Sequence, residues 1–131
     1  MTPTILSVDD EDDVTALVRF HLLKAGYQVL TASCGREALH LIQSRLPDLI
    51  LLDLMLPDID GFGVCEILRR EAATAAIPIV ILTAWATSDA RNLGLELGAL
   101  DYMTKPFSPK ELVERVRRLL DLRLPSPNLR A

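Results

Sequence analysis

Along this 131-residue chain, short apolar runs typical of strands alternate with segments in which apolar residues recur at helical spacing. Short apolar runs typical of strands occupy residues 4–8, 27–31, 49–52, 78–82 and 100–104. After each run, apolar residues recur at the three- and four-residue spacing of amphipathic helices, over residues 14–25, 36–45, 62–71, 88–97 and 108–122. Alternating strands and helices with short connections predict the α/β class, with a parallel sheet covered by helices on both faces.

The residues of each strand predict its place in the sheet. Residues 49–52 and 79–82 are continuously apolar, as in central strands with helices against both faces. Residues 27–31 alternate between apolar and polar, as in a half-exposed strand at an edge. Gly26 and Gly98 stand where the first and fourth helices should end, because glycine tolerates the left-handed backbone that closes a helix.

Length, composition and charge indicate one domain with a short tail. The chain is 50% hydrophobic and 24% charged, as is typical of a globular domain that needs no disulfide or metal to fold. We assign residues 1–122 to this domain and residues 123–131, which contain Pro125 and Pro127, to a C-terminal tail or linker. The net charge of -4 argues against direct contact of this domain with nucleic acid.

The cysteines, the N-terminal residues and the length of the apolar runs indicate the cellular location to expect. Cys34 and Cys65 lack metal-ligand spacing, so we expect free thiols in a reduced, cytoplasmic protein. Residues 1–6 carry no basic segment of the kind that begins a signal peptide. No apolar run approaches the roughly 18 residues of a membrane helix, so we expect no membrane association.

Polar residues stand at the carboxyl ends of four predicted strands. Asp9 and Asp10 follow the first strand, Asp53 the third, Thr83 the fourth and Lys105 the fifth. Because the carboxyl ends of parallel strands share one edge of the sheet, these side chains should meet there. The sequence therefore predicts a site of three carboxylates, one hydroxyl and one ammonium.

This set of groups favours phosphoryl chemistry with a hard divalent cation. Neighbouring carboxylates repel one another, and a bound cation relieves the repulsion. Oxygen ligands favour Mg²⁺, Ca²⁺ or Mn²⁺ over zinc, and Mg²⁺ is the usual partner of phosphate oxygens. The ammonium and hydroxyl suit the remaining phosphoryl oxygens, and a carboxylate can itself be the nucleophile that forms an acyl phosphate.

Four motifs in order make the chain resemble the receiver domains of two-component response regulators over residues 4–121. The motifs are Val8-Asp9-Asp10-Glu11, Leu51-Leu52-Asp53-Leu54-Met55-Leu56-Pro57, Ile81-Leu82-Thr83-Ala84 and Asp101-Tyr102-Met103-Thr104-Lys105-Pro106-Phe107. The resemblance implies a doubly wound, five-stranded parallel sheet in the order 2-1-3-4-5, the flavodoxin-like (βα)5 fold. It also implies a phosphorylation-activated signalling switch.

The resemblance implies a phosphoacceptor and its metal ligands. Asp53 matches the residue that takes a phosphoryl group from a phosphohistidine of a sensor histidine kinase or phosphotransfer protein. Asp10, Asp53 and the backbone carbonyl of Met55 match the ligands of Mg²⁺, for which Mn²⁺ could substitute. Asp9 matches the acid that binds the metal through water. Such a domain assists its own phosphorylation and dephosphorylation and is not an enzyme in the usual sense.

Five further positions match residues that respond to the phosphoryl group. Lys105 matches the lysine that pairs with the acceptor at rest and with phosphate afterwards, and its peptide bond to Pro106 matches one that is cis in the family. Thr83 and Ala84 match the positions that bind phosphoryl oxygens. Tyr102 matches the aromatic residue that turns inward behind the switch hydroxyl.

The motif style is closest to receivers that carry a winged-helix DNA-binding effector. Such receivers form phosphorylation-dependent homodimers through the fourth helix, fifth strand and fifth helix. The matching positions here are Arg91, Leu97, Leu100, Asp101, Glu111 and Arg115. Two of them, Leu97 and Leu100, are commonly acidic in the family, so this face is more apolar than usual and could bind a different partner.

Other function classes fit less well. A phosphatase with an aspartyl nucleophile would carry a second acid where Met55 stands, and a flavodoxin-like electron carrier would not carry the acidic run from Asp9 to Asp13 at its phosphate loop. A phosphorylation-independent interaction scaffold with a receiver-like fold remains the alternative. Trp85, two residues after Thr83, suggests the hypothesis that an indole shields the acyl phosphate from water.

Overall fold

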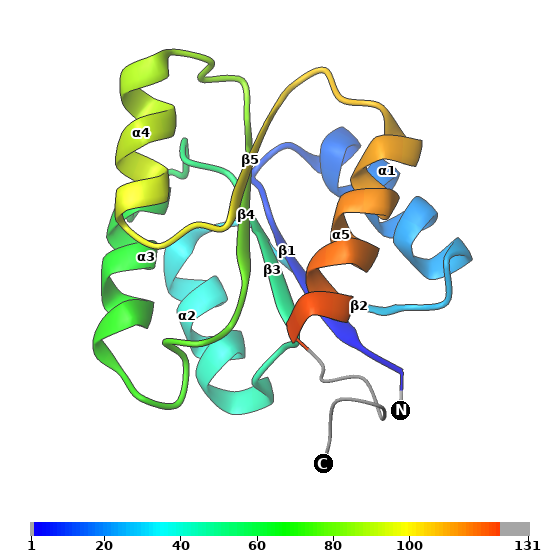
Figure 1. The fold of residues 1–131 in the computed structure, drawn as a ribbon, viewed down its shortest axis with the longest axis horizontal. Helices are drawn as coiled ribbons and strands as arrows, with labels where there is room; N and C mark the ends of the chain where they lie inside the picture. Colours follow the sequence, from blue (N-terminus) through cyan, green and yellow to red (C-terminus); the bar gives the residue numbers. More distant parts are fainter. Residues whose placement is uncertain (1, 124–131) are drawn as a thin grey trace.

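Five parallel strands form the sheet at the centre of the computed structural model, which describes residues 2–123 (Figure 1). The strands are β1 Thr4–Val8, β2 Gln28–Ala32, β3 Leu49–Leu52, β4 Ile79–Thr83 and β5 Asp101–Thr104. Their order across the sheet is β2-β1-β3-β4-β5, and every neighbouring pair is parallel. The predicted α/β class, the doubly wound sheet and the strand order are therefore confirmed.

The helices cover the sheet in two layers. They are α1 Asp12–Lys24, α2 Gly35–Arg45, α3 Gly61–Arg70, α4 Ser88–Glu96 and α5 Pro109–Arg123. Helices α1 and α5 lie on one face, and α2, α3 and α4 lie on the other (Figure 1). Each face has its own apolar core, because alternate residues of a buried strand such as β3 point to opposite layers: Ile50 and Leu52 to one, Leu49 and Leu51 to the other.

The burial of each strand follows its sequence. Every residue of β3 and β4 is buried, as their continuous apolar runs predicted, whereas β2 at the edge is largely exposed or half-buried. Helix and strand bounds lie within two residues of the predicted ones. The largest difference is at α1, which begins at Asp12, where acidic side chains in the first turn suit the helix dipole.

Side chains far apart in sequence cap two of the helices. The carboxylate of Asp58, in the loop after β3, accepts N–H groups of Gly35 at 2.7 Å and Arg36 at 2.9 Å at the start of α2. A guanidinium nitrogen of Arg69 on α3 donates to the carbonyl of Glu96 at 2.7 Å, at the end of α4. Both contacts satisfy backbone groups that a helix end leaves open.

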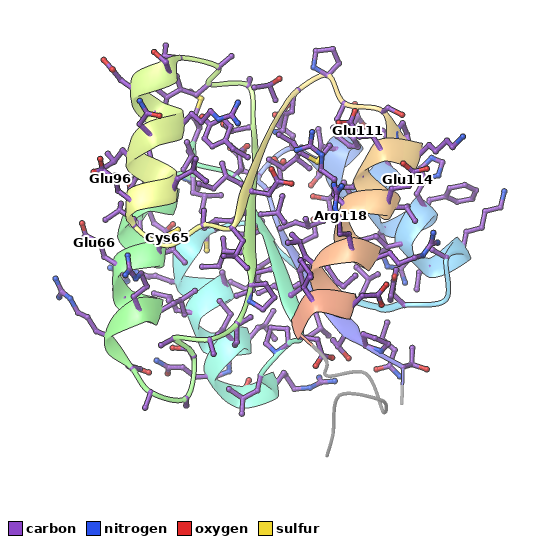
Figure 2. The ribbon with its side chains drawn as sticks, viewed as in Figure 1. Cys65, Glu66, Glu96, Glu111, Glu114 and Arg118 are labelled. Carbon is purple, nitrogen blue, oxygen red and sulfur yellow. The ribbon has the colours of Figure 1, made fainter. Side chains whose placement is uncertain are left out.

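The outer surfaces of the helices carry the charged side chains. Figure 2 shows Glu66 and Glu96 on the outside of α3 and α4, and Glu114 and Arg118 on α5, whereas Cys65 points inward. Among residues 2–123, no helix has the length and apolar character needed to cross a membrane. The predicted tail lies outside the described residues from position 124 onward.

Candidate functional site

The predicted polar residues meet at the carboxyl edge of the sheet, because the strand ladders continue past the strand ends. The N–H of Asp53 donates to the carbonyl of Val8 at 3.0 Å, and that of Lys105 to the carbonyl of Thr83 at 2.8 Å. The N–H of Asp9 likewise donates to the carbonyl of Ala32, at the end of β2, at 3.0 Å. The sheet therefore fixes the backbone of these site residues.

Three carboxylates form the centre of the site. Asp9, Asp10 and Asp53 each offer an oxygen, and these oxygens lie within 4.8 Å of one another. Only 4% of the Asp9 and Asp53 side chains is exposed, whereas Asp10 is exposed to solvent. Backbone N–H groups of Glu11 and Met55 donate to Asp9 at 2.9 Å and to Asp53 at 3.1 Å. Burial raises the pKa of the Asp9 carboxyl above its ordinary value.

Lys105 supplies the positive charge of the cluster. Its Nζ atom lies 2.7 Å from Asp9, 2.8 Å from Glu11 and 2.9 Å from Asp53, and its side chain is 11% exposed. Burial alone would lower the pKa of this ammonium, but the hydrogen bonds to Asp53, Asp9 and Glu11 more than offset burial and hold the pKa above its ordinary value. The Lys105–Pro106 peptide bond is cis.

Thr83 and Tyr102 both bond to the backbone of Trp85. The Thr83 hydroxyl, fully buried at the end of β4, accepts the N–H of Trp85 at 3.3 Å. The Tyr102 hydroxyl donates to the Trp85 carbonyl, and the Tyr102 side chain is buried. Burial, and then the charge of Asp53, raise the pKa of the Tyr102 phenol. Ala84 lies exposed in the turn between Thr83 and Trp85.

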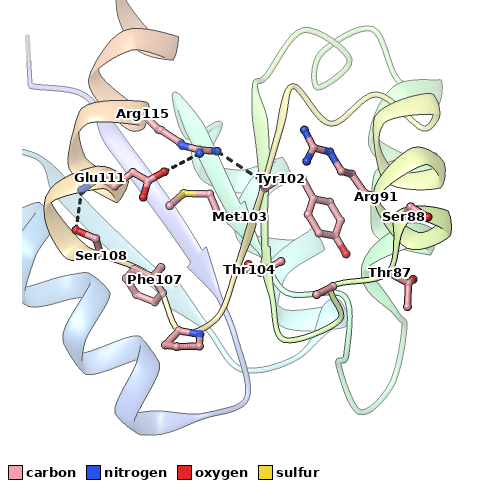
Figure 3. A pocket seen from close by; sticks show the side chains of 12 residues that line it. Thr87, Ser88, Arg91, Tyr102, Met103, Thr104, Phe107, Ser108, Glu111 and Arg115 are labelled. Carbon is pink, nitrogen blue, oxygen red and sulfur yellow. Dashed lines mark hydrogen bonds and ion pairs between the residues drawn. The ribbon is translucent and has the colours of Figure 1, made fainter.

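A hollow of about 440 Å³ opens beside this site, between α4, β5 and α5 (Figure 3). Figure 3 shows Arg91 and Tyr102 on one side of the hollow, with Arg115 and Glu111 on the other. Arg115 pairs within the chain with Asp101 at 2.9 Å and with Glu111 at 2.7 Å. Three residues of the predicted dimer face, Arg91, Glu111 and Arg115, therefore line one hollow, and Asp101 joins them through its ion pair with Arg115.

Two apolar residues of that predicted face differ in exposure. Leu97 is half-buried and packs against the core cluster beneath α4, whereas Leu100 is 60% exposed. Leu93 and Leu95, which the sequence did not single out, are also exposed on α4, at 41% and 39%. Of the two predicted residues, Leu100 therefore exposes more apolar surface than Leu97.

The comparisons with known proteins decide the family. The family model described as response regulator receiver domain matches residues 5–117. The chain belongs to this family. The receiver family binds Mg²⁺ at an acidic pocket, and the cluster of Asp9, Asp10 and Asp53 fits that ion, because hard cations prefer oxygen ligands.

Relatives of this receiver domain are regulators of transcription. It is 49% identical, over 92% of its length, to the alkaline phosphatase synthesis transcriptional regulatory protein PhoP of Bacillus subtilis. It is 47% identical, over 90% of its length, to the DNA-binding dual master transcriptional regulator RpaA of Synechocystis. It covers 49% of each of these proteins, so the chain spans about half the length of these relatives. The predicted closeness to receivers of DNA-binding regulators is confirmed.

Solved structures agree with the family. A putative response regulator from Chloroflexus aurantiacus has a TM-score of 0.88 and 43% sequence identity, covering 92% of this chain and 98% of that one. A receiver domain of the CheY-like type from Methanospirillum hungatei has a TM-score of 0.89 at 28% identity, covering 94% and 97%. The chain is therefore a receiver domain of two-component systems.

The sequence missed one member of the charged cluster, Glu11. Its side chain pairs with Lys105, although the sequence placed Glu11 only within the acidic run from Asp9 to Asp13. The predicted helix start at residue 14 hid this role, because only the observed start at Asp12 makes Glu11 the N-cap of α1, a position that favours Ser, Thr, Asp or Asn. A glutamate there that makes no capping bond points to another use of its carboxylate.

Proposed function

We propose that this receiver domain is a phosphorylation-activated switch whose Asp53 accepts a phosphoryl group when Mg²⁺ is present. The supporting observation is the placement of the Asp53 carboxylate, which lies beside those of Asp9 and Asp10 and pairs with the Lys105 ammonium at 2.9 Å. A nucleophile, an acidic metal pocket and a cation for phosphoryl oxygens thus share one edge of the sheet.

The donor is a phosphohistidine of a sensor histidine kinase or of a phosphotransfer protein. An oxygen of Asp53 attacks phosphorus in line with the phosphorus–nitrogen bond. The new phosphorus–oxygen bond forms as that bond breaks, and its electron pair stays on the imidazole nitrogen. The backbone bonds to Val8 and Met55 hold Asp53 in one position, so the domain contributes orientation to the reaction.

The metal would be held by few protein groups. Asp10, Asp53 and the carbonyl of Met55 would bind Mg²⁺ directly, and Asp9 would bind it through water; Mn²⁺ could replace it. When bound, the ion supplies positive charge to the phosphoryl oxygens. Lys105 would donate to one further phosphoryl oxygen, since its ammonium already lies against the acceptor.

The response of the fold would begin at Thr83. Its hydroxyl would leave the Trp85 N–H for a phosphoryl oxygen, joined there by the N–H of Ala84. Tyr102, bonded to the backbone carbonyl of the same residue, Trp85, would respond to this movement and change the surface of α4, β5 and α5. The domain would also assist its own dephosphorylation, as a reactant and not as an enzyme.

The output would be a homodimer that forms on phosphorylation. Arg91, Asp101, Glu111 and Arg115 would exchange ion pairs across it, and Leu97 and Leu100 would add apolar contact. In the single chain, Asp101 and Glu111 both pair with the guanidinium of Arg115. These internal ion pairs would therefore have to open before the same residues could pair across the dimer. Regulation of transcription, a cytoplasmic location and the lack of direct nucleic-acid contact by this domain remain predictions.

Intact mass spectrometry after incubation with acetyl phosphate and Mg²⁺ tests the proposal. We expect one added phosphoryl group, absent from Asp53→Asn and from a sample with EDTA. No adduct, together with no Mg²⁺ binding, would favour the phosphorylation-independent scaffold.

A further inference from the structure

We infer that Glu11 is a positioning residue that receives the Lys105 ammonium when a divalent cation binds Asp10 and Asp53 directly and Asp9 through water. The inference rests on the proposed function, because it concerns how the lysine and the metal share one acidic cluster. The starting observation is that Lys105 has three carboxylate partners within 2.9 Å, and an ammonium has three N–H donors.

Each oxygen of the two buried partners of Lys105 already has one hydrogen-bond or ion-pair partner. One oxygen of Asp9 accepts the Glu11 N–H at 2.9 Å, and the other lies 2.7 Å from Lys105. One oxygen of Asp53 accepts the Met55 N–H at 3.1 Å, and the other lies 2.9 Å from Lys105. Because the backbone donors are fixed by the chain, the flexible lysine is the partner that can move when a cation takes up these oxygens.

Glu11 is the carboxylate that can keep the Lys105 ammonium paired after it leaves Asp9 and Asp53. Its carboxylate oxygen already lies 2.8 Å from Nζ, and 59% of its side chain is exposed, so it sits at the open side of the cluster. Asp9 and Asp53 are 4% exposed and belong to the predicted metal pocket, whereas Glu11 is outside the set of carboxylates gathered there. A shift toward Glu11 keeps the ammonium paired and separates its charge from that of the cation.

The local structure of Glu11 supports a use beyond helix stability. Glu11 is the N-cap of α1, and its side chain makes no capping hydrogen bond. Its own N–H donates to Asp9, which fixes the backbone of Glu11 against the cluster. A residue in a position that favours shorter polar side chains has instead turned its carboxylate to Lys105.

Magnesium titration by calorimetry at constant ionic strength tests the inference. Glu11→Gln should weaken Mg²⁺ binding about two- to fivefold more than Asp12→Asn, a range typical of one exposed ion pair. Asp12 is the matched control, because it is exposed on the neighbouring residue and Lys105 makes no ion pair with it in the described structure. Both substitutions remove one negative charge near the site.

A double-mutant cycle separates the lysine contact from plain charge. If Glu11 acts through Lys105, Glu11→Gln should weaken Mg²⁺ binding no more than Asp12→Asn does once Lys105 has been replaced by Gln. Equal effects of Glu11→Gln and Asp12→Asn on the native background, or an undiminished effect on the Lys105→Gln background, would overturn the inference alone. Failure of the unsubstituted chain to bind Mg²⁺ would overturn the proposed function as well.

Discussion

The Nζ atom of Lys105 lies 2.9 Å from Asp53, and both side chains are almost enclosed, with 11% and 4% of their surfaces exposed. The same ammonium holds Asp9 at 2.7 Å. One lysine therefore offsets the mutual repulsion of two buried acids that lie at the ends of separate strands.

Replacing Lys105 by Met should lower the free energy of unfolding by about 2–3 kcal/mol at neutral pH. This is below most values for a broken buried pair, since the cluster is open to water near Glu11. Added Mg²⁺ should recover much of the loss, because the ion replaces the missing charge. Urea unfolding with and without Mg²⁺ measures both effects. Lys110→Met, at an exposed position of α5, is the control; an equal loss there would contradict this account.

The remote cap of α2 predicts a dependence of stability on pH. The Arg36 N–H, with the N–H groups of Ile59 and Gly35, holds the pKa of the Asp58 carboxyl well below its ordinary value of 3.8. Since the folded pKa is the lower one, the ionised group stabilises the fold above pH 3.8, and this contribution disappears as pH falls from there toward the folded value.

Asp58→Asn should therefore have a lower urea midpoint than the native chain at neutral pH, and the difference should shrink below pH 3.8. Asp60→Asn is the matched control. Asp60 caps α3 by accepting the Gly63 N–H at 2.9 Å, and asparagine is an equally good N-cap. A difference for Asp58→Asn that is constant with pH would refute the charged cap.

Two glycines with similar backbones should respond differently to alanine. Gly26 and Gly98 have φ of 99° and 110°, so a side chain is strained at both. A Cβ at Gly26 would meet open space, whereas one at Gly98 would lie 2.5 Å from the Cδ atom of Arg69. We expect Gly26→Ala to lower the free energy of unfolding by roughly 1 kcal/mol, and Gly98→Ala to lower it clearly more. Thermal unfolding measures both, and equal costs would show that Arg69 does not crowd Gly98.

The two thiols should differ in reactivity. Burial raises the pKa of the Cys65 thiol to about 11, and Cys65 is fully enclosed, whereas Cys34 is half-buried. Because the thiolate is the reactive form, a thiol reagent should modify Cys34 in the folded chain and Cys65 only on unfolding. Cys34→Ser should abolish the early reaction and Cys65→Ser should leave it. Early loss of the Cys65 thiol would mean that α3 opens readily.

Trp85 is the single tryptophan of the chain and should report the switch. Its backbone N–H is bonded to Thr83 and its backbone carbonyl to Tyr102, and its ring packs edge-on against Phe62 with the ring centroids 5.7 Å apart. Beryllofluoride with Mg²⁺ should therefore change its emission, and Thr83→Ala should reduce the change. An unchanged spectrum, with beryllofluoride binding shown independently, would argue against movement at Thr83.

Most of the fold could be predicted because its cause is local. The periods of apolar residues fixed the strands and helices to within two residues, and continuous runs marked β3 and β4 as buried. The site followed from topology, since Asp9, Asp53 and Lys105 each come directly after a strand.

Contacts between distant loops could not be predicted in this way. The bond between the Asp58 carboxylate and the Gly35 N–H depends on how the loop after β3 lies against α2, which begins 23 residues earlier. The pairing of Lys105 with Glu11 spans 94 residues and depends on the side-chain rotamers at the edge of the sheet. The spacing of apolar residues predicts helices and strands, but it does not predict how a distant loop packs or which rotamer a side chain adopts.

Borohydride reduction followed by peptide mass mapping tests the central claim most directly. Borohydride converts the acyl phosphate of an aspartate to homoserine, so the modified residue can be located after treatment with acetyl phosphate and Mg²⁺. The account predicts homoserine at Asp53 and unchanged aspartate at Asp9 and Asp10. Homoserine at another acid, with Asp53 intact, would contradict it.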